Sequence, residues 1–595
     1  MEVPSSGKRR YMPGIDGLRA IAVIGVILYH LNIPWFQGGF TGVTVFFVLS
    51  GYLITDILID EWSTNNKIDY IRFMIRRFRR LAPALLSMIF IVTLLVIFTN
   101  HPSFEKLRSD FFPSLLYVTN WWYIFHEVSY FDRFGPASPL THIWSLGIEE
   151  QFYLIWPLLV IIGFSFIKRK RFRILAILFG VVTSAWLMAF LYIPGGDPSR
   201  VYYGTDTRAF SLLLGAALAF VWPSQKLSRT LPRHASMVLE IIGIAGLLII
   251  VMNFIVISEF DSFHYQGGML LLSIITSLVV AAFAHPASMI GKWLSVKPLR
   301  WIGIRSYGIY LWHYPIIILT TPIVNTDGIN VWRITLQLGA TLIISALSYR
   351  FVETPIRAGK IKFSLTTFRK QTIVQQRLVI GSCAVLFAVL IGILFVFAGK
   401  TTVMVTTKAP LTIETINQIE FIHEPTLEPE PEPEPAPAPD PKSKSITVIG
   451  DSILYDVAPF FKNHYPEAVI DYRVGRQMKE IPEVIKQLEG SGQLGEYVII
   501  QLGTNGPFVK TDLINVINSL DHKKVYLINC RVPRAWEFTV NHTLEEVVNS
   551  IPNTVLIDWY SASAGHPEFF SKDGVHLSRA GGETYANLIA DTLAE

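Results

Sequence analysis

Residues 144–167 read WSLGIEEQFYLIWPLLVIIGFSFI, a stretch of 24 positions in which apolar side chains dominate. A transmembrane helix needs roughly 20 mostly apolar residues, so this stretch is long enough to cross a bilayer. Similar apolar runs lie at residues 15–31, 40–59, 81–98, 174–193, 209–222, 237–256, 269–284, 307–323, 332–352 and 378–397. The sequence therefore predicts a polytopic α-helical membrane domain with about eleven transmembrane helices.

The composition agrees with a membrane protein and excludes an ordinary cytosolic enzyme. Of the 595 residues, 51% are hydrophobic and only 16% are charged, whereas a soluble protein usually carries about 25% charged residues. The two cysteines, Cys383 and Cys530, lie far apart in the sequence. Two cysteines cannot build a disulfide framework or a zinc ligand cluster, so we expect no metal site.

Charge is distributed unevenly along the chain. Residues 1–400 carry 36 basic and 19 acidic residues, residues 401–445 carry 3 and 8, and residues 446–595 carry 12 and 19. Basic clusters fall in every second connection between the apolar runs, at residues 8–10, 72–80, 168–173, 226–233, 292–300 and 357–370. By the positive-inside rule, this alternation predicts a cytoplasmic N-terminus and an extracellular C-terminus. A basic excess beside apolar runs also favours contact with the bilayer over contact with nucleic acid.

The chain divides into three predicted parts, a membrane domain at 1–400, a linker at 401–445 and a soluble domain at 446–595. The linker contains EPTLEPEPEPEPAPAPDP at 424–441, and alternating Pro and Glu favours an extended spacer. Short apolar runs of the soluble domain lie at residues 446–449, 468–474, 497–502, 524–529 and 554–559. Because helical stretches separate these runs, we expect an α/β domain with a parallel sheet, whose site lies at the carboxyl ends of the strands.

Three polar motifs of the soluble domain suit a serine hydrolase-like site. They are GDS at 450–452, GTN at 503–505 and DGVH at 573–576. A serine at a helix start can act as a nucleophile, an asparagine amide can donate to an oxyanion, and an aspartate can orient a histidine base. Each motif alone also fits an ordinary turn or loop. Their joint occurrence favours a Ser–His–Asp site.

In this order, the three motifs resemble the SGNH hydrolase superfamily. The resemblance implies Ser452 as the nucleophile, His576 as the general base and Asp573 as the residue that orients the base. It also implies an oxyanion hole formed by the Ser452 and Gly475 backbone N–H groups and the Asn505 side chain. The residue after this asparagine is glycine, where many members carry aspartate. This departure concerns the surroundings of the oxyanion hole and not the triad.

Charged residues inside predicted spans are costly and are therefore candidates for function. Arg19 and His30 are eleven residues apart in the first span, which places them on one helix face about 16 Å apart along the axis. Glu149 and Glu150 lie near one end of the fourth span. Because adjacent helical residues face different ways, at most one of the two is expected to point into a site. Snorkelling toward the membrane surface would also explain such residues.

Seven motifs of the membrane domain resemble the acyltransferase-3 membrane family, over about residues 10–358. They are Arg19-x10-His30, FFVLSGY at 46–52, RRFRRLAP at 76–83, WSLGIEEQFY at 144–153, TDTR at 205–208, YLWHYP at 310–315 and YRFVETP at 349–355. The resemblance implies acyl-transfer roles within the membrane domain for Arg19, His30, Glu149 and His313. It also implies that the basic motif faces cytoplasmic acyl-coenzyme A with Arg76, Arg77 and Arg80. Membrane topology alone would also explain this basic motif.

The fusion of both parts in one chain resembles the OatA-type peptidoglycan O-acetyltransferases of Gram-positive bacteria. The resemblance implies an enzyme that moves acetyl from cytoplasmic acetyl-coenzyme A across the membrane to Ser452 and then to the 6-hydroxyl of N-acetylmuramic acid. That modification would confer lysozyme resistance. We expect no bound cofactor beyond the acetyl donor. Alternatives are acetylation of another surface polysaccharide, a transporter with a tethered esterase and a wall-anchoring protein without enzymatic activity.

Overall fold

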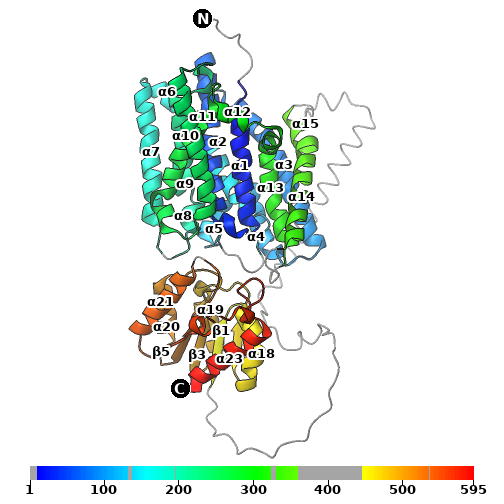
Figure 1. Ribbon diagram of the computed structural model, residues 1–595, viewed down its shortest axis with the longest axis vertical. Helices are drawn as coiled ribbons and strands as arrows, with labels where there is room; N and C mark the ends of the chain where they lie inside the picture. The colour runs from blue at the N-terminus through cyan, green and yellow to red at the C-terminus, as the bar shows by residue number, and fades with distance from the viewer. Residues whose placement is uncertain are drawn as a thin grey trace, which may run out of the picture. The chain divides into compact units, whose positions relative to one another are not determined.

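The computed structural model describes residues 10–131, 137–194, 196–322, 330–358, 445–520, 522–534 and 536–594. The predicted span at 378–397 and almost all of the predicted linker at 401–445 lie outside these residues. The described chain forms a helical unit up to residue 358 and a sheet-containing unit from residue 445 (Figure 1).

Long helices dominate the helical unit. They are α1 (Pro13–His30), α2 (Gly42–Asn65), α3 (Tyr70–Phe98), α6 (Trp144–Phe166), α7 (Lys170–Leu191), α9 (Thr205–Val221), α10 (Arg233–Val256), α11 (Met269–Ala284), α13 (Lys297–Thr320) and α14 (Val331–Ser348). Shorter helices connect them, namely α4 (Phe104–Leu115), α5 (Thr119–Phe125), α8 (Ser199–Tyr203), α12 (Met289–Trp293) and α15 (Thr354–Arg357).

The described helices agree with the predicted membrane fold. Within the described residues, nine helical segments are long and apolar enough to cross a membrane. Each predicted apolar run before residue 358 overlaps one of the long helices. Helix α13 is not among the nine segments, and its first half carries several basic residues. The prediction of a polytopic helical domain is therefore confirmed, and the number of eleven spans remains a prediction.

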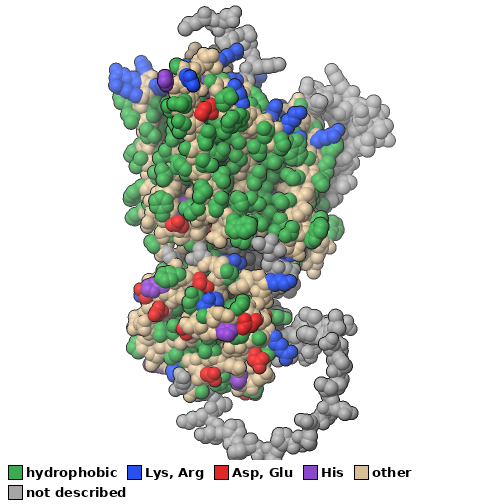
Figure 2. All heavy atoms as spheres, in the orientation of Figure 1, with side chains coloured by type: hydrophobic (Ala, Val, Ile, Leu, Met, Phe, Trp, Pro, Cys, Tyr) green, Lys and Arg blue, Asp and Glu red, His purple; other side chains and the backbone are tan. Residues whose placement is uncertain are grey.

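The outer surface of the helical unit suits a lipid environment. Large apolar side chains such as Phe98, Phe166, Phe179 and Trp332 are exposed, and Figure 2 shows hydrophobic side chains covering the sides of the helices. Lys and Arg gather at the end of the unit near the first described residues (Figure 2). An apolar belt bounded by basic side chains is typical of a membrane-spanning helix bundle.

Glycines let helices α2 and α9 approach each other closely. A Cβ atom at Gly51 would collide with the Leu212 carbonyl oxygen, and one at Gly215 would collide with the Val48 carbonyl oxygen. In lipid there is no hydrophobic driving force between helices, so the close van der Waals packing that small residues allow stabilises such crossings instead. This packing fixes α2, which carries several residues of the cavity described below.

Helix α3 begins earlier than the sequence interpretation placed the span. It starts at Tyr70, and the Asp69 side chain accepts a hydrogen bond from the Arg72 backbone N–H at 2.9 Å. An aspartate cap and a run of helix-favouring arginines explain this early start. The basic cluster at 72–80 is therefore helical rather than a connecting loop, so its arginines point in fixed and different directions.

The second unit is an α/β domain with a five-stranded sheet in the order β2-β1-β3-β4-β5, and all four strand pairs are parallel. The strands are β1 (Ile446–Gly450), β2 (Val469–Tyr472), β3 (Tyr497–Gln501), β4 (Lys524–Ile528) and β5 (Thr554–Ile557). The helices are α18 (Ile453–His464), α19 (Ile481–Gly490), α20 (Lys510–Ser519), α21 (Glu537–Ser550), α22 (Trp559–Ala562) and α23 (Arg579–Ala594). The predicted parallel α/β fold is confirmed.

The strand order places a natural ligand crevice between β1 and β3. The chain leaves β1 toward β2 on one side and returns to β3 on the other side. At such a topological switch point, the loops after the two strands diverge and leave a crevice at their carboxyl ends. The GDS motif follows β1 and the GTN motif follows β3, so both border this crevice.

Candidate active site

Ser452 stands at the turn from β1 into α18. It occupies the position before the first residue of the helix, with helical backbone angles of φ −64° and ψ −20°. A Cβ atom at Gly450 would lie 2.6 Å from Leu454 and 2.7 Å from the Gln501 side chain. Only glycine fits there, so the turn is tight and presents the serine at the carboxyl edge of the sheet.

His576 and Asp573 form a hydrogen-bonded line with this serine. The His576 Nε2 atom lies 3.1 Å from Ser452 Oγ, and His576 Nδ1 lies 2.6 Å from Asp573 Oδ2. The second oxygen of Asp573 accepts the backbone N–H groups of Val575 at 3.0 Å and His576 at 3.1 Å. Gly574 has a φ of 69°, which closes the turn between acid and base. A proton on Nδ1, held by the carboxylate, leaves Nε2 free to accept the serine proton.

The electrostatics of the pair suit a general base. Burial lowers the pKa of His576, but the hydrogen bond and charge of Asp573, with smaller contributions from Asp456 and Asp451, outweigh burial and raise the pKa above its usual value. Burial acts to raise the pKa of Asp573, but the hydrogen bonds from His576 and the Val575 backbone lower it overall. Asp573 therefore stays ionised and holds the imidazole as the stronger base.

The loop that carries Gly475 is fixed to the end of β1. Gly475 has a φ of 76°, a conformation that favours glycine. The Arg476 guanidinium donates to the Gly450 carbonyl at 3.1 Å and to the Asp471 carbonyl at 2.8 Å, and also pairs with the Asp471 carboxylate. Arg476 is buried. Through Arg476, the structure thus holds the Gly475 turn against Gly450, the first residue of the GDS motif.

Asn505 is held by an acid that sequence analysis did not single out. The Asn505 Nδ2 atom donates to Asp451 Oδ2 at 2.8 Å, which leaves the second amide hydrogen for a ligand. Asp451 also accepts the Thr504 hydroxyl and, at 3.0 Å, the Ile453 backbone N–H. Burial raises the pKa of Asp451 to about 6. Its place directly before the serine was the signal that could have identified it.

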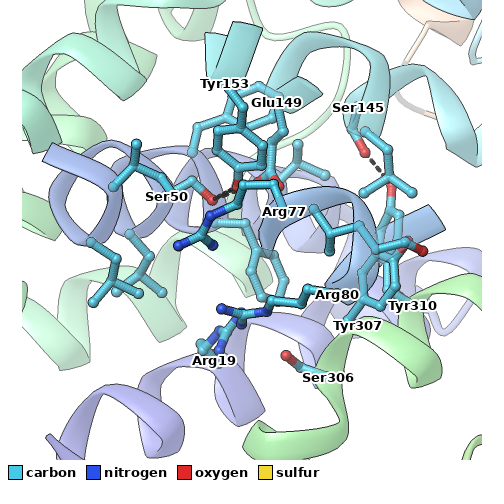
Figure 3. Close-up of a pocket in the computed structure, with 18 of the residues that line it drawn as sticks. Arg19, Ser50, Arg77, Arg80, Ser145, Glu149, Tyr153, Ser306, Tyr307 and Tyr310 are labelled. Atoms are coloured by element: carbon cyan, nitrogen blue, oxygen red, sulfur yellow. Dashed lines mark hydrogen bonds between the residues drawn. The ribbon is translucent and has the colours of Figure 1, made fainter. Parts of the chain in front are cut away.

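The helical unit contains a polar cavity of about 230 Å³. Arg19, Arg77, Arg80 and Glu149 line it together with Ser50, Tyr153, Ser306, Tyr307 and apolar side chains of α2. Figure 3 shows the Arg77 guanidinium near the Ser50 and Tyr153 hydroxyls, the Arg19 and Arg80 guanidinium groups close to each other, and Tyr310 farther along the wall. Arginines and a glutamate from three helices, α1, α3 and α6, thus share one cavity, which a bundle without a polar ligand would not need.

Glu149, and not Glu150, belongs to this cavity. Its carboxylate accepts the Ser50 hydroxyl at 2.9 Å and the Tyr153 hydroxyl at 3.1 Å. Arg76 does not line the cavity, because its guanidinium pairs with Glu61 at 3.0 Å on the exposed side of α3. Of the three arginines in the basic motif that were singled out, the structure therefore brings two to the cavity.

His30 and His313 meet at a second polar cluster instead of lining the cavity. His30 Nδ1 lies 2.8 Å from His313 Nε2, and His30 Nε2 lies 2.9 Å from the Tyr130 hydroxyl. Tyr310 connects the two places, because it lines the cavity while its ring lies 5.3 Å from the His313 ring. The Tyr310 hydroxyl also lies 2.7 Å from Ser145 Oγ. Tyr310 thus lies between the cavity and the histidine pair.

Comparison with known proteins identifies the family. Residues 12–350 match the model of an acyltransferase domain family. Over 98% of both chains, the protein is 42% identical to the peptidoglycan O-acetyltransferase OatA of Listeria monocytogenes. The chain belongs to the OatA family of acyltransferases. It is also 39% identical to the O-acetyltransferase OatA of Staphylococcus aureus, over 98% of this chain and 96% of that one.

A solved structure is also similar to this OatA-family chain. It is the C-terminal catalytic domain of the Streptococcus pneumoniae peptidoglycan O-acetyltransferase OatA, at 22% identity and a TM-score of 0.24, covering 25% of this chain and 92% of that chain.

The two sites of this OatA-family chain differ in the chemistry they allow. In the sheet unit, a serine, a histidine base and oriented amide donors suit attack on an acyl group and stabilisation of the resulting oxyanion. In the helical unit, three guanidinium groups suit an anionic ligand. The sequence motifs did not single out Tyr130 as the partner of His30, or the contact between Tyr310 and Ser145 beside the cavity. Tyr310 opens the YLWHYP motif, and that placement was the available signal.

Proposed function

We propose that this OatA-family chain is an O-acetyltransferase that moves acetyl from cytoplasmic acetyl-coenzyme A to the 6-hydroxyl of N-acetylmuramic acid in peptidoglycan, and thereby confers lysozyme resistance. The hydrogen-bonded line of Asp573, His576 and Ser452 carries the proposal. The name of the Listeria relative supports the acceptor. The basic clusters support a cytoplasmic N-terminus, a membrane domain at 1–400, an outer linker at 401–445 and an outer domain at 446–595.

The first half of the reaction is assigned to the helical unit. Arg77 and Arg80 attract the anionic donor, and the cavity of about 230 Å³ takes the acetylated end of it. This volume is below the roughly 300–1,000 Å³ of typical sites for whole drug-sized ligands, so most of coenzyme A stays outside. Arg19 polarises the thioester carbonyl, and Glu149 holds the Ser50 and Tyr153 hydroxyls of the cavity wall. His30, paired with His313, then serves as the base or carrier along the path from the cavity.

The second half is assigned to Ser452. His576 takes the Ser452 proton while the hydroxyl oxygen attacks the acetyl carbonyl, and the oxyanion is held by the Ser452 and Gly475 N–H groups and by Asn505. Loss of one such donor costs roughly 3–4 kcal/mol of barrier. The donor group then leaves with the proton and acetyl-Ser452 remains. A sugar hydroxyl next gives its proton to His576 and attacks this ester, which releases free Ser452 and the acetylated glycan.

Mass analysis of muropeptides tests the proposal. Cells that carry the wild-type chain are compared with cells that carry Ser452→Ala or His30→Ala, after matching the amount of protein in the membrane. We expect 6-O-acetylated muramic acid only with the wild-type chain. Unchanged 6-O-acetylation in either mutant removes that residue from the mechanism. Acetyl groups found on another surface glycan instead would replace the proposed acceptor.

A further inference from the structure

Tyr455 exposes a large aromatic ring one helical turn after Ser452. The residue is 57% exposed, although Ile453, Leu454 and Val457 around it on α18 are buried. The Tyr455 backbone N–H donates to the Ser452 carbonyl oxygen at 3.2 Å. Residues three apart on a helix share a face, with Cβ atoms roughly 5–6 Å apart. The ring therefore stands next to Ser452 on the same side of the helix.

A second tyrosine supports this ring from the neighbouring strand. Tyr472 is the last residue of β2 and is paired in register with Gly450 of β1. The two ring centroids lie 6.1 Å apart with an interplanar angle of 71°, which is an edge-to-face contact. Such a contact restricts the Tyr455 ring before any ligand arrives. Binding to the ring then costs less side-chain entropy than binding to an isolated tyrosine.

A charged residue is the immediate neighbour of Tyr472 in the chain. Arg473 follows Tyr472 directly, and its backbone N–H donates to the Gly450 carbonyl at 3.2 Å. The Arg473 guanidinium forms an ion pair with Glu480, and their side chains are 46% and 30% exposed. A flat apolar ring beside a few oriented donors and acceptors is the composition of a small-molecule subsite. Pyranose rings fit it, because they present C–H groups on one face and hydroxyls around the edge.

Tyr560 provides a contrast at the opposite edge of the sheet. It follows β5 and is 39% exposed. The Arg531 guanidinium lies over its ring, 4.1 Å from the centroid, so one face is already covered. Tyr560 is thus a partly exposed tyrosine of the same unit without a place near Ser452. It serves as a matched control for the role of Tyr455.

We propose that Tyr455, held by Tyr472, is the stacking platform for a pyranose ring of the acceptor glycan, and that Arg473 and Glu480 bind its polar edge. The inference rests on the proposed function, because it takes the acceptor to be a sugar. It names the residues that bind the acceptor glycan. A sugar stacked there places a hydroxyl beside acetyl-Ser452. The platform therefore favours transfer to glycan and has no effect on attack by water.

The full chain in detergent tests the platform. An aryl acetate serves as the acetyl donor, and soluble oligomers of alternating N-acetylglucosamine and N-acetylmuramic acid serve as acceptors. For Tyr455→Ala we expect the KM for the oligomer to rise about tenfold, the scale of one good interface contact, with aryl acetate hydrolysis unchanged. Tyr455→Phe keeps the ring and should behave like the wild type. Tyr560→Ala should change neither the KM for the oligomer nor the rate of aryl acetate hydrolysis.

Two results would overturn the platform. One is an unchanged KM for the oligomer in Tyr455→Ala, and the other is an equal loss of hydrolysis and transfer, which indicates a structural role.

A binding titration of the same oligomers with the Ser452→Ala chain, with and without Tyr455→Ala, separates the platform from the proposed function. If the wild-type chain hydrolyses the ester but acetylates no glycan, the proposed function fails. Weaker binding by the double variant would still support the platform, and equal binding would refute it.

Discussion

At the scale of single residues, Asp451 links the nucleophilic turn to the oxyanion side of the sheet unit. Its carboxylate accepts the Ile453 N–H of the serine turn and the Asn505 amide of the loop after β3. An asparagine in its place keeps one carbonyl oxygen but replaces the second acceptor by a donor. The Asn505 amide would then face another amide and turn away from the oxyanion.

We therefore predict that Asp451→Asn lowers kcat for aryl acetate hydrolysis about 100-fold, the cost of one lost oxyanion donor. Steady-state kinetics of the purified full chain measure the effect. Thr504→Val is the matched control, because it removes the other side-chain donor to Asp451 and leaves Asn505 bound. We expect Thr504→Val to lower kcat for aryl acetate hydrolysis less than tenfold. Equal activities of Asp451→Asn and wild type would show that Asn505 needs no such anchor.

The pH profile follows from the raised pKa of His576. The base must be neutral, so activity falls as the pH drops through this pKa, above the ordinary value of about 6.5. Asp573→Asn removes the hydrogen bond and charge that raise the pKa, while burial continues to lower it. We predict that the acidic limb of kcat/KM moves to lower pH than in the wild type, and that kcat falls about 10⁴-fold.

Aryl acetate hydrolysis between pH 4 and 9 checks this shift, with the Thr504→Val chain as the control that keeps Asp573, Asp456 and Asp451, the carboxylates that raise the pKa of His576. An acidic limb at the wild-type position in Asp573→Asn would mean that another group controls it.

The cluster of Ser452, His576 and Asp573 could be expected from the sequence, whereas the residues that support it could not. The order of the GDS, GTN and DGVH motifs pointed to Ser452, Asn505 and His576, and the first two motifs lie at the ends of neighbouring parallel strands, β1 and β3. The anchoring roles of Arg476 and Asp451 depend on contacts between residues that are 26 and 54 positions apart in the chain. No local pattern encodes such distances.

At the scale of elements, helix α3 sorts the arginines of the basic motif by direction. Successive residues turn by about 100°, so Arg77 and Arg80 face the cavity while Arg76 pairs with Glu61 outside it. A loop would have allowed all of them to reach one ligand. The sequence revealed the motif but not this selection, because the start of the helix at Tyr70 lies well before the apolar run.

We predict that Arg77→Ala and Arg80→Ala each abolish wall acetylation, since the cavity that is proposed to bind the anionic donor loses a guanidinium group. Arg76→Ala removes the same charge from the same end of α3 and should keep at least half of the wild-type acetylation, because an exposed ion pair contributes little. Ester release from isolated cell walls measures the acetyl content, normalised to the amount of protein in the membrane. Equal loss in all three variants would assign the arginines to topology alone.

At the scale of the whole molecule, the two units are proposed to perform two separable half-reactions. The helical unit contains the arginine cavity and the His30–His313 pair, and the sheet unit contains the hydrogen-bonded line of Ser452, His576 and Asp573. The sequence showed this division through composition, since net charge and apolar content change between the two parts. It did not show the place of Tyr310 between the cavity and the histidine pair, which depends on the packing of helices α6 and α13.

This division predicts how substitutions separate the two activities. An aryl acetate reaches Ser452 directly, so His30→Ala should hydrolyse it at the wild-type rate while it loses acetylation that depends on acetyl-coenzyme A. Ser452→Ala should lose both activities, because acetyl delivered by the helical unit finds no acceptor. Sealed vesicles with radiolabelled acetyl-coenzyme A enclosed on the cytoplasmic side measure the first activity, and the added ester measures the second. If His30→Ala lost ester hydrolysis as well, the half-reactions would not be separable. If Ser452→Ala still acetylated external glycan, the helical unit would transfer acetyl without the sheet unit, and the serine relay would be refuted.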